Sequence, residues 1–285
     1  MKSLRTVLLF VPGDRPDFFK KAAESSADTL IFDLEDAVAA EKKESSRLLV
    51  EQALAEGFPG NKELVVRVNA LSSPWGTEDI TMVRRFGEVI NAILIPKAEP
   101  AEVQLTEQLL GEADVCIICQ IETARGLQLA YDTILSSSRV IGAMLGAEDL
   151  AVEMNLRRTP GGKEIEHARH KLVLAACAAA VQPIDTPYLK IDDLEGLRSD
   201  TFRAREIGFT AKTALSPRQV PVIRKLFQPD PEELEEARLI LKAAEEARSL
   251  GRGVVTMDGA MIDAPVVTRA RRIIELAGGD VNNDS

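Results

Sequence analysis

Residues 115–122 read VCIICQIE, an apolar run that turns polar only at its last residues. Short runs of this kind, rich in valine and isoleucine, are typical of strands covered on both faces of a sheet. Seven further runs have the same pattern: 6–11 (TVLLFV), 29–34 (TLIFDL), 64–69 (LVVRVN), 92–97 (AILIPK), 140–146 (VIGAMLG), 182–185 (QPID) and 209–216 (FTAKTALS). The sequence therefore predicts eight parallel strands.

Helix-compatible stretches separate these runs. They are residues 16–26, 42–56, 78–89, 101–111, 126–135, 164–180 and 193–207, and further helices are expected at 217–227, 231–250 and 266–277. This alternation predicts a (β/α)8 TIM barrel over residues 1–228. A doubly wound open sheet is the alternative, but such sheets usually carry a GxGxxG turn after the first strand, whereas this chain reads VPGDRP. We interpret residues 229–285 as a C-terminal helical extension or lid.

The composition excludes several classes of partner. Of 285 residues, 35 are basic and 45 acidic, which gives a net charge of −10. No basic stripe interleaved with aromatic residues occurs, so nucleic acid is not an expected partner. No apolar stretch is long enough to span a bilayer, so no membrane partner is expected either. Three cysteines are too few for a disulfide framework in a chain of this size, which favours a reducing, cytoplasmic location.

Polar residues gather at the ends of the predicted strands, where the active site of a barrel lies. They are Asp33, Glu35, Asp36, Arg67, Asn69, Lys97, Glu122, Glu148, Asp149 and Asp185. Glu122 and Asp149 end consecutive strands, so both can point into one mouth. Carboxylates without nearby histidine or cysteine suit a hard cation such as Mg²⁺, and His167 and His170 lie in a predicted helix instead. Taken singly, each acid could also cap the following helix.

Arg67 lies among the valines of LVVRVN. A charged residue inside an apolar strand needs a buried partner or a place in the site. Its planar guanidinium suits a carboxylate, or an oxygen that gains negative charge during a reaction. We therefore interpret Arg67 as a substrate-binding and catalytic residue.

Several motifs together resemble the citrate lyase beta-subunit-like group of lyases, which includes malyl-CoA and citramalyl-CoA lyases. In chain order they are LLFVPGDRPDFFKKA, DTLIFDLEDAV, VVRVN, ILIPKAE, IETARG, GAEDL, IDTPYLKIDDLEGL, GFTAKTALSPRQ and DGAMIDAPVV, across nearly the whole chain. The resemblance implies an enzyme, a Mg²⁺-dependent carbon–carbon lyase. Its substrate would be a 3-hydroxyacyl-CoA thioester such as malyl-, citramalyl- or citryl-CoA, cleaved to acetyl-CoA and a 2-oxo acid or formed from them.

The resemblance also implies roles for residues of the barrel. It implies that Glu122 and Asp149 bind Mg²⁺ and that Arg67 contacts the oxo acid or its hydroxyl oxygen. Glu35 and Asp36 would stand near the metal, one step outside its ligands.

The same resemblance implies roles for the C-terminal extension and for residues that would contact the substrate and its CoA group. Asp263 would act as acid or base in the mouth of a neighbouring subunit, which implies a homo-oligomer, commonly a trimer or hexamer. Arg15 and Lys21 would contact the CoA phosphates, and Lys97 would bind substrate. Two positions depart from the pattern, because Phe18 and Ser216 stand where relatives often have arginine and histidine. Both departures concern acyl-CoA specificity more than the metal.

Two enzymatic alternatives remain open on the sequence. One is a citrate lyase beta subunit that acts on an acyl-carrier-protein thioester, and the other is a hydroxyacyl-CoA thioesterase. A non-catalytic binding subunit is disfavoured, because it would be free to lose a set such as Arg67, Glu122, Asp149 and Asp263.

Overall fold

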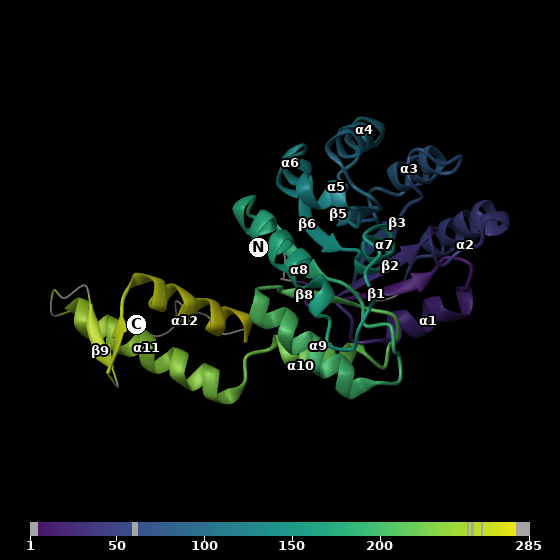
Figure 1. Ribbon diagram of the computed structural model, residues 1–285. Coiled ribbons are helices and arrows are strands. Elements are labelled where there is room, and N and C mark those ends of the chain that lie inside the picture. Colours follow the sequence, from purple (N-terminus) through teal and green to yellow (C-terminus); the bar gives the residue numbers. More distant parts are fainter. Residues whose placement is uncertain (1–4, 59–61, 250, 252–253, 258, 278–285) are drawn as a thin grey trace. The chain divides into compact units, whose positions relative to one another are not determined.

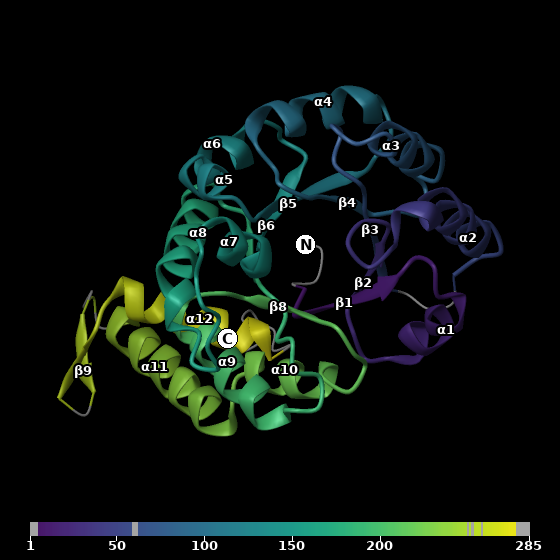
Figure 2. The ribbon, with the colours of Figure 1, turned by 45° about the vertical axis from the view of Figure 1, so that its right-hand side comes forward.

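The computed structural model describes residues 5–58, 62–249, 251, 254–257 and 259–277, and contacts divide the chain into two compact units, Met1–Lys225 and Leu226–Ser285. The first unit contains a closed barrel of parallel strands (Figure 2). They are β1 (Val7–Pro12), β2 (Thr29–Asp33), β3 (Glu63–Arg67), β4 (Ala92–Ile95), β5 (Cys116–Ile121), β6 (Val140–Leu145), β7 (Gln182–Asp185) and β8 (Ala211–Ala214). Each strand pairs with the next and β8 pairs with β1, so the predicted eight-stranded barrel is confirmed.

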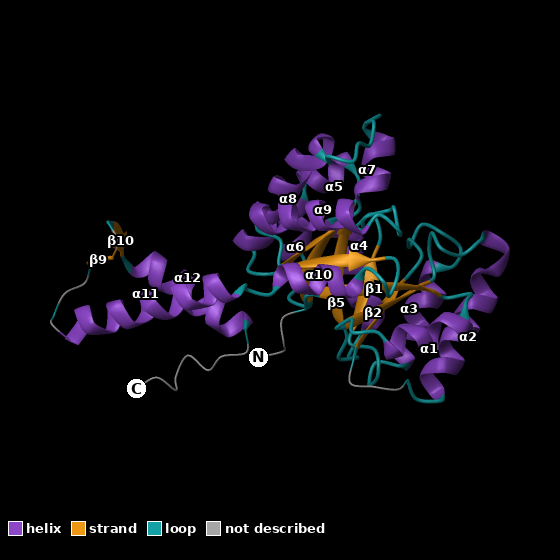
Figure 3. Ribbon diagram, turned by 90° about the horizontal axis from the view of Figure 1, so that it is seen from below, coloured by secondary structure: helices purple, strands orange, loops and turns teal. Residues whose placement is uncertain are grey.

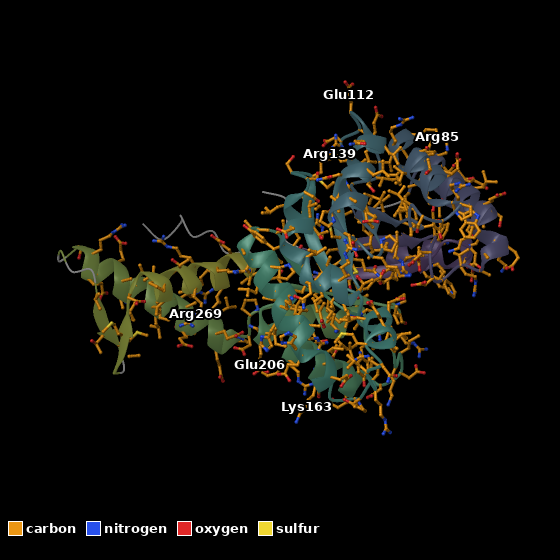
Figure 4. All side chains as sticks on the ribbon, turned by 45° about the horizontal axis from the view of Figure 1, so that its top comes forward. Arg85, Glu112, Arg139, Lys163, Glu206 and Arg269 are labelled. Carbon is orange, nitrogen blue, oxygen red and sulfur yellow. The ribbon has the colours of Figure 1, made fainter. Side chains whose placement is uncertain are left out.

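Helices surround the strands (Figures 1 and 2). They are α1 (Pro16–Glu24), α2 (Lys43–Ala55), α3 (Gly76–Arg85), α4 (Pro100–Leu110), α5 (Ala124–Gln128), α6 (Ala130–Leu135), α7 (Ala147–Glu153), α8 (Glu166–Ala178), α9 (Leu194–Ile207) and α10 (Val220–Phe227), with 3-10 turns η1 (Ala40–Lys42) and η2 (Lys163–Ile165). Their exposed charges include both signs, as Arg85, Lys163 and Glu206 illustrate (Figure 4).

Two helix predictions were wrong in detail. The stretch 126–135 is not one helix but two, α5 and α6, which meet at Leu129. Helix α7 was not predicted, and Glu148 and Asp149 lie in its first turn rather than at the end of the sixth strand. Because α7 follows β6 after a single residue and is only seven residues long, its apolar pattern is too short to separate from the strand.

Apolar side chains from several strands fill the barrel interior. Leu8, Ile31, Val65, Ile118 and Ile184 all belong to this buried cluster. Side chains alternate between the two faces of a strand, so the residue after each of these faces the surrounding helices.

This alternation overturns the expectation that Asp185 faces the mouth. Asp185 follows the inward-facing Ile184, and its fully buried carboxylate accepts hydrogen bonds from Arg169 on α8 and Lys212 on β8. Asp200 on α9 binds the same two cations at 2.8 and 2.7 Å. Burial opposes the ionisation of Asp200, but Lys212 and Arg169 outweigh it and hold its pKa at about 2. This cluster (Arg169, Asp185, Asp200 and Lys212) joins the sheet to α8 and α9.

The second unit consists of α11 (Pro231–Ser249), the strands β9 (Val255–Met257) and β10 (Ala260–Ile262), and α12 (Ala264–Leu276). Helices α11 and α12 pack side by side (Figure 3). Both were predicted, but the antiparallel pair β9–β10 was not, because three-residue strands carry too little periodicity to detect. Residues 250, 252–253, 258 and 278–285 of the predicted extension lie outside the described residues. Among the described helices, none is both long and apolar enough to cross a bilayer.

Replacing Lys212 by methionine leaves two buried carboxylates with one cation instead of two. We expect Lys212→Met to lower the free energy of unfolding by about 3–5 kcal/mol, as when one partner of a buried pair is removed. Urea denaturation followed by circular dichroism measures this change. Arg218→Met is the matched control, because Arg218 pairs with Asp192 on the exposed surface, where a pair contributes about 0–1 kcal/mol. Equal effects in the two variants would contradict a stabilising role for the cluster.

Candidate active site

A pocket of about 420 Å³ lies where the barrel strands end. Residues from several strands and the loops that follow them line it, among them Phe10, Asp33, Arg67, Glu122, Asp149 and Thr186. Parallel strands bring their carboxyl ends to the same side of a barrel, so side chains from distant parts of the chain meet here.

Glu122 directly follows β5, and its carboxylate is held at both oxygens. The backbone N–H of Lys97 donates to Oε1 at 2.8 Å, and Nε2 of Gln120 donates to Oε2. Gly146 makes room for this arrangement, since a Cβ at that position would lie 2.4 Å from Glu122 Oε2. Each oxygen of Glu122 keeps a further lone pair for another ligand.

Burial raises the pKa of Glu122 to about 7, and the negative charge of Asp149 adds to the effect. The hydrogen bonds from Gln120 and Lys97 favour the ionised form, but they do not outweigh burial. A carboxylate in this state is stabilised by any cation that binds beside it.

Asp149 lies in the first turn of α7 and lines the same pocket as Glu122. Its side chain is 41% exposed, and Nζ of Lys97 lies 3.9 Å from its Oδ1. Lys97 thus contacts both acids, Glu122 through its backbone and Asp149 through its ammonium group. It is not among the residues that line the pocket.

The donor set at this position fits Mg²⁺. Within the described residues, no group of three or more histidine, cysteine or acidic side chains is arranged to hold a metal ion. Glu122 and Asp149 would therefore supply two oxygen ligands and leave other positions to water and substrate. Mg²⁺ usually binds through one or two carboxylates in this way, whereas structural zinc takes four protein ligands.

Arg67, at the end of β3, is fixed by acidic neighbours. It donates to both carboxylate oxygens of Asp33, from Nε at 2.7 Å and from Nη2 at 2.6 Å. Nη1 lies 2.9 Å from Glu35 Oε2 and 3.2 Å from Asp36 Oδ2. The guanidinium also lies over the ring of Phe10, 5.0 Å from its centre. Burial lowers the pKa of Arg67, but these acids outweigh it and raise the pKa above its ordinary value, so the cation is permanent.

Glu35 and Asp36 differ in their surroundings although they are adjacent. Asp36 lines the pocket, and its side chain is 57% exposed. Glu35 is buried. Its Oε2 forms an ion pair with Arg67, but the two groups are not oriented for a hydrogen bond. Burial raises the pKa of Glu35 to about 8, Arg67 opposes this, and the charges of Asp36 and Glu122 add to it. Lys43 stabilises this loop by donating to the carbonyls of Leu34 and Glu35 at 2.9 and 2.6 Å.

Arg15 and Lys21 are not among the residues that line the pocket. Arg15 is exposed, binds Asp17 through two hydrogen bonds and lies over the ring of Phe18 at 4.1 Å. Nζ of Lys21 lies 5.5 Å from the centre of the same ring. Phe18, which departs from the family pattern, thus contacts both Arg15 and Lys21, the cations that the resemblance predicted to contact CoA phosphates. Ser216 lies just after Leu215, which lines the pocket, and its Oγ accepts from the backbone N–H of Arg218.

Asp263 belongs to the second unit, where it caps α12. Its Oδ1 accepts a hydrogen bond from the backbone N–H of Val266 at 3.2 Å, and its side chain is half-buried. Its part in the chemistry remains a prediction.

Two residues of the site were not singled out from the sequence. Asp33, the main partner of Arg67, was noted only as one of many strand-end acids. Asp33 and Arg67 are directly paired between β2 and β3, and this strand register cannot be read from the sequence. Gln120 was not considered, although it lies two residues before Glu122 and therefore shares its inward face.

Comparisons with known proteins identify the family to which the chain belongs. Residues 6–217 match the model of the HpcH/HpaI aldolase/citrate lyase family. The chain is 37% identical to the citrate lyase subunit beta of Leuconostoc mesenteroides subsp. cremoris, with 99% of this chain and 96% of that protein covered. It is 33% identical to a (3S)-malyl-CoA thioesterase of Cereibacter sphaeroides (strain KD131 / KCTC 12085), with 95% and 93% covered.

A solved structure is similar over the same length. The crystal structure of protein CitE from Mycobacterium tuberculosis, in complex with magnesium, acetoacetate and coenzyme A, superposes with a TM-score of 0.81. The two sequences are 31% identical, and 98% of this chain and 100% of that chain are covered. The chain belongs to the HpcH/HpaI aldolase/citrate lyase family.

Proposed function

We propose that this protein is a Mg²⁺-dependent carbon–carbon lyase of 3-hydroxyacyl-CoA thioesters. It would cleave a substrate such as malyl-, citramalyl- or citryl-CoA to acetyl-CoA and a 2-oxo acid, or run in the reverse direction. The observation that carries the proposal is one pocket in which the carboxylates of Glu122 and Asp149 stand together with the guanidinium of Arg67. The magnesium and coenzyme A bound to the similar CitE protein support the choice of cofactor and substrate class.

The side chains of the pocket have separate tasks in this reaction. Glu122 and Asp149 would hold the cation, which supplies Lewis-acid stabilisation of the substrate oxygen where charge develops. Arg67 would donate a hydrogen bond to that oxygen, and the fixed geometry given by Asp33 means that it need not reorganise when charge appears. Glu35 and Asp36 would keep Arg67 in place from its other side.

Cleavage would move two protons: the substrate hydroxyl loses one to water as it becomes a carbonyl group, and the carbon that leaves as acetyl-CoA gains one from a donor. We assign this role to Asp263, which would give a proton to the thioester enolate carbon in cleavage and remove one in condensation. In this proposal Asp263 acts on the pocket of a neighbouring subunit, and the protein is a homo-oligomer such as a trimer or hexamer. The three unpaired cysteines support a cytoplasmic location.

Two other activities are favoured by particular relatives. The (3S)-malyl-CoA thioesterase of C. sphaeroides supports hydrolysis of the thioester, with the carbon skeleton left intact. The citrate lyase beta subunit of L. mesenteroides supports a substrate carried on an acyl carrier protein. The products distinguish the first, since a thioesterase releases a free hydroxy acid and CoA. The second is distinguished by activity on the acyl-carrier-protein thioester and not on the CoA thioester.

Replacing Asp149 by asparagine removes one cation ligand's charge and keeps its size. We expect Asp149→Asn to reduce Mg²⁺-dependent release of acetyl-CoA and oxo acid by at least about a hundredfold, because a cation supplies several kcal/mol to the transition state. Assays with malyl-, citramalyl- and citryl-CoA, with Mg²⁺ or with EDTA, measure this loss and identify the substrate. Asp132→Asn on the exposed face of α6 is the matched control. Full activity of Asp149→Asn would remove the metal assignment, and no cleavage of any of the three would overturn the proposed substrates.

The raised pKa values of Glu35 and Glu122 make the stability of the metal-free protein depend on pH. Each carboxyl binds its proton more tightly in the folded than in the unfolded chain, where its pKa is near 4.5, and holds it up to about 8 and about 7. Their stabilising contribution is therefore complete below pH 4.5 and lost as pH rises to about 8, with a slope of at most about 1.4 kcal/mol per pH unit for each group.

Urea denaturation of metal-free protein at pH 5.5 and pH 8 measures this dependence. Glu122→Gln cannot ionise at this position, so we expect it to lose less stability over the same interval. Mg²⁺ added at pH 8 should raise the stability of wild type but not of Glu122→Gln. An identical pH dependence in both proteins would contradict the raised pKa of Glu122.

Asp263→Asn separates proton transfer from binding. We expect it to keep Mg²⁺ affinity but to lose most of the turnover, by about 10²–10⁴-fold, as is typical when a general acid or base is removed. If Asp263 acts between subunits, we expect a mixture of Asp263→Asn and Asp149→Asn, under conditions of subunit exchange, to regain some activity. Some sites would then combine an intact Asp149 from one subunit with an intact Asp263 from another. No recovery in the mixture would contradict a shared site.

A further inference from the structure

Helix α7, which carries Asp149, begins without a cap of its own. The residue before it is Gly146, which has no side chain to accept a hydrogen bond from the first N–H groups of the helix. Serine, threonine, asparagine or aspartate usually stands at such a position. None of them fits here, because a Cβ on Gly146 would lie 2.4 Å from both Cβ and Oε2 of Glu122. The pocket carboxylate therefore excludes the ordinary cap of α7.

The neighbouring strand supplies the missing acceptor. Strand β7 pairs with β6, and Thr186 is the residue that follows β7. Its Oγ1 accepts a hydrogen bond from the backbone N–H of Ala147, the first residue of α7, at 3.3 Å. This N–H has no partner within the helix, because it belongs to the first turn. Thr186 thus takes the place of a helix cap for α7.

Thr186 is itself held in place by its neighbours. Its carbonyl accepts a hydrogen bond from Nζ of Lys212 at 2.6 Å, and Oγ1 of Thr213 donates to the preceding carbonyl, that of Asp185, at 3.1 Å. Pro187 follows and restricts the backbone of Thr186 to extended conformations. The β-branched side chain adds its own restriction, since few rotamers are open to it. The hydroxyl of Thr186 is therefore a fixed anchor for α7.

Helix α7 has few other anchors. Of its seven residues, Ala147, Leu150 and Ala151 are buried. Val152 is 83% exposed, and residues 153–155 are exposed as well. A helix this short is marginally stable by itself and depends on such contacts. The hydrogen bond to Thr186 therefore contributes substantially to fixing the first turn, which carries Asp149.

We propose that Thr186 is a positioning residue for the metal site, because its hydroxyl caps α7 from the neighbouring strand and so holds Asp149 where it would meet the cation with Glu122. The inference rests on the proposed function, in which Asp149 is a cation ligand, and deepens it. Without the cap, the first turn of α7 would take other arrangements. The cation would then bind only the fraction of molecules in which Asp149 is in place.

Thr186→Val removes the hydroxyl and keeps the size and branching of the side chain. We expect Thr186→Val to weaken Mg²⁺ binding by about fivefold to tenfold, the effect of losing a helix cap of typical strength. Thr186→Ser keeps the hydroxyl and should stay within about twofold of wild type. Calorimetric titration of the full chain with Mg²⁺ at pH 8 measures the affinity without substrate or turnover. Hydrogen-exchange mass spectrometry should show faster exchange of the α7 amides in Thr186→Val than in wild type.

Thr201→Val is the matched control. Thr201 is also buried, but its hydroxyl donates within α9, to the carbonyl of Leu197 at 2.7 Å. Both valine variants lose one buried hydrogen bond, so both should unfold at a slightly lower urea concentration than wild type. Thr201→Val should nevertheless bind Mg²⁺ as wild type does and leave the exchange of the α7 amides unchanged.

An unchanged Mg²⁺ affinity in Thr186→Val, or an equal loss in Thr186→Ser, would overturn the positioning role while leaving the proposed lyase intact. An equal loss in Thr201→Val would also overturn it, because the loss would then follow from stability alone. If wild type binds no Mg²⁺, the proposed metal site is overturned, and the role of Thr186 with it. Should Thr186→Val fail to fold, Thr186→Ala provides the same comparison with Thr186→Ser.

Discussion

The ion pair between Arg67 and Asp33 makes this acid-rich barrel mouth possible. Two strands place the residues opposite each other in register, and the guanidinium binds the carboxylate through two parallel hydrogen bonds. A guanidinium or carboxylate buried there without its partner would destabilise the fold by several kcal/mol. The same cation lies within ion-pair distance of Glu35 and Asp36, so one arginine compensates the acids of the β2 end.

Arg67 thereby divides the acids of the pocket into two groups. Asp33, Glu35 and Asp36 pair with the arginine. The charge of Arg67 lowers the pKa of Glu122 less than burial raises it, and Asp149 lies 3.9 Å from the ammonium group of Lys97. Glu122 consequently has a pKa raised to about 7 by its burial and by Asp149. An arrangement of this kind favours a divalent cation, which would compensate both charges at once. In the proposed lyase, Arg67 and a cation held by Glu122 and Asp149 would both stabilise the substrate oxygen that gains negative charge.

A pocket residue and a member of the buried ionic cluster are adjacent in the sequence, at Thr186 and Asp185. The cluster stabilises the fold, whereas the pocket can bind a ligand. Asp185 faces the helices with Arg169, Lys212 and Asp200, and the four buried charges balance one another. Thr186, the next residue, faces the pocket, and its carbonyl accepts a hydrogen bond from Lys212. The Oγ1 of Thr186 accepts from the backbone N–H of Ala147, where α7 begins. The structural cluster thus supports the wall of the pocket from behind.

The sequence by itself determined the eight strands, most helices and the ends at which polar residues gather, because apolar runs and their periodicity are local properties. It also pointed to Glu122, Asp149 and Arg67, which the structure places on one pocket. Tertiary structure alone decided which face each strand-end residue takes, since a shift of one residue reverses it. That is why Asp185 was wrongly expected in the mouth and why Asp33 and Gln120 were passed over. Asp33 matters through its ion pair with Arg67 on the neighbouring strand, and Gln120 through the hydrogen bond that it donates to Glu122. Neither contact can be read from a local pattern of apolar residues.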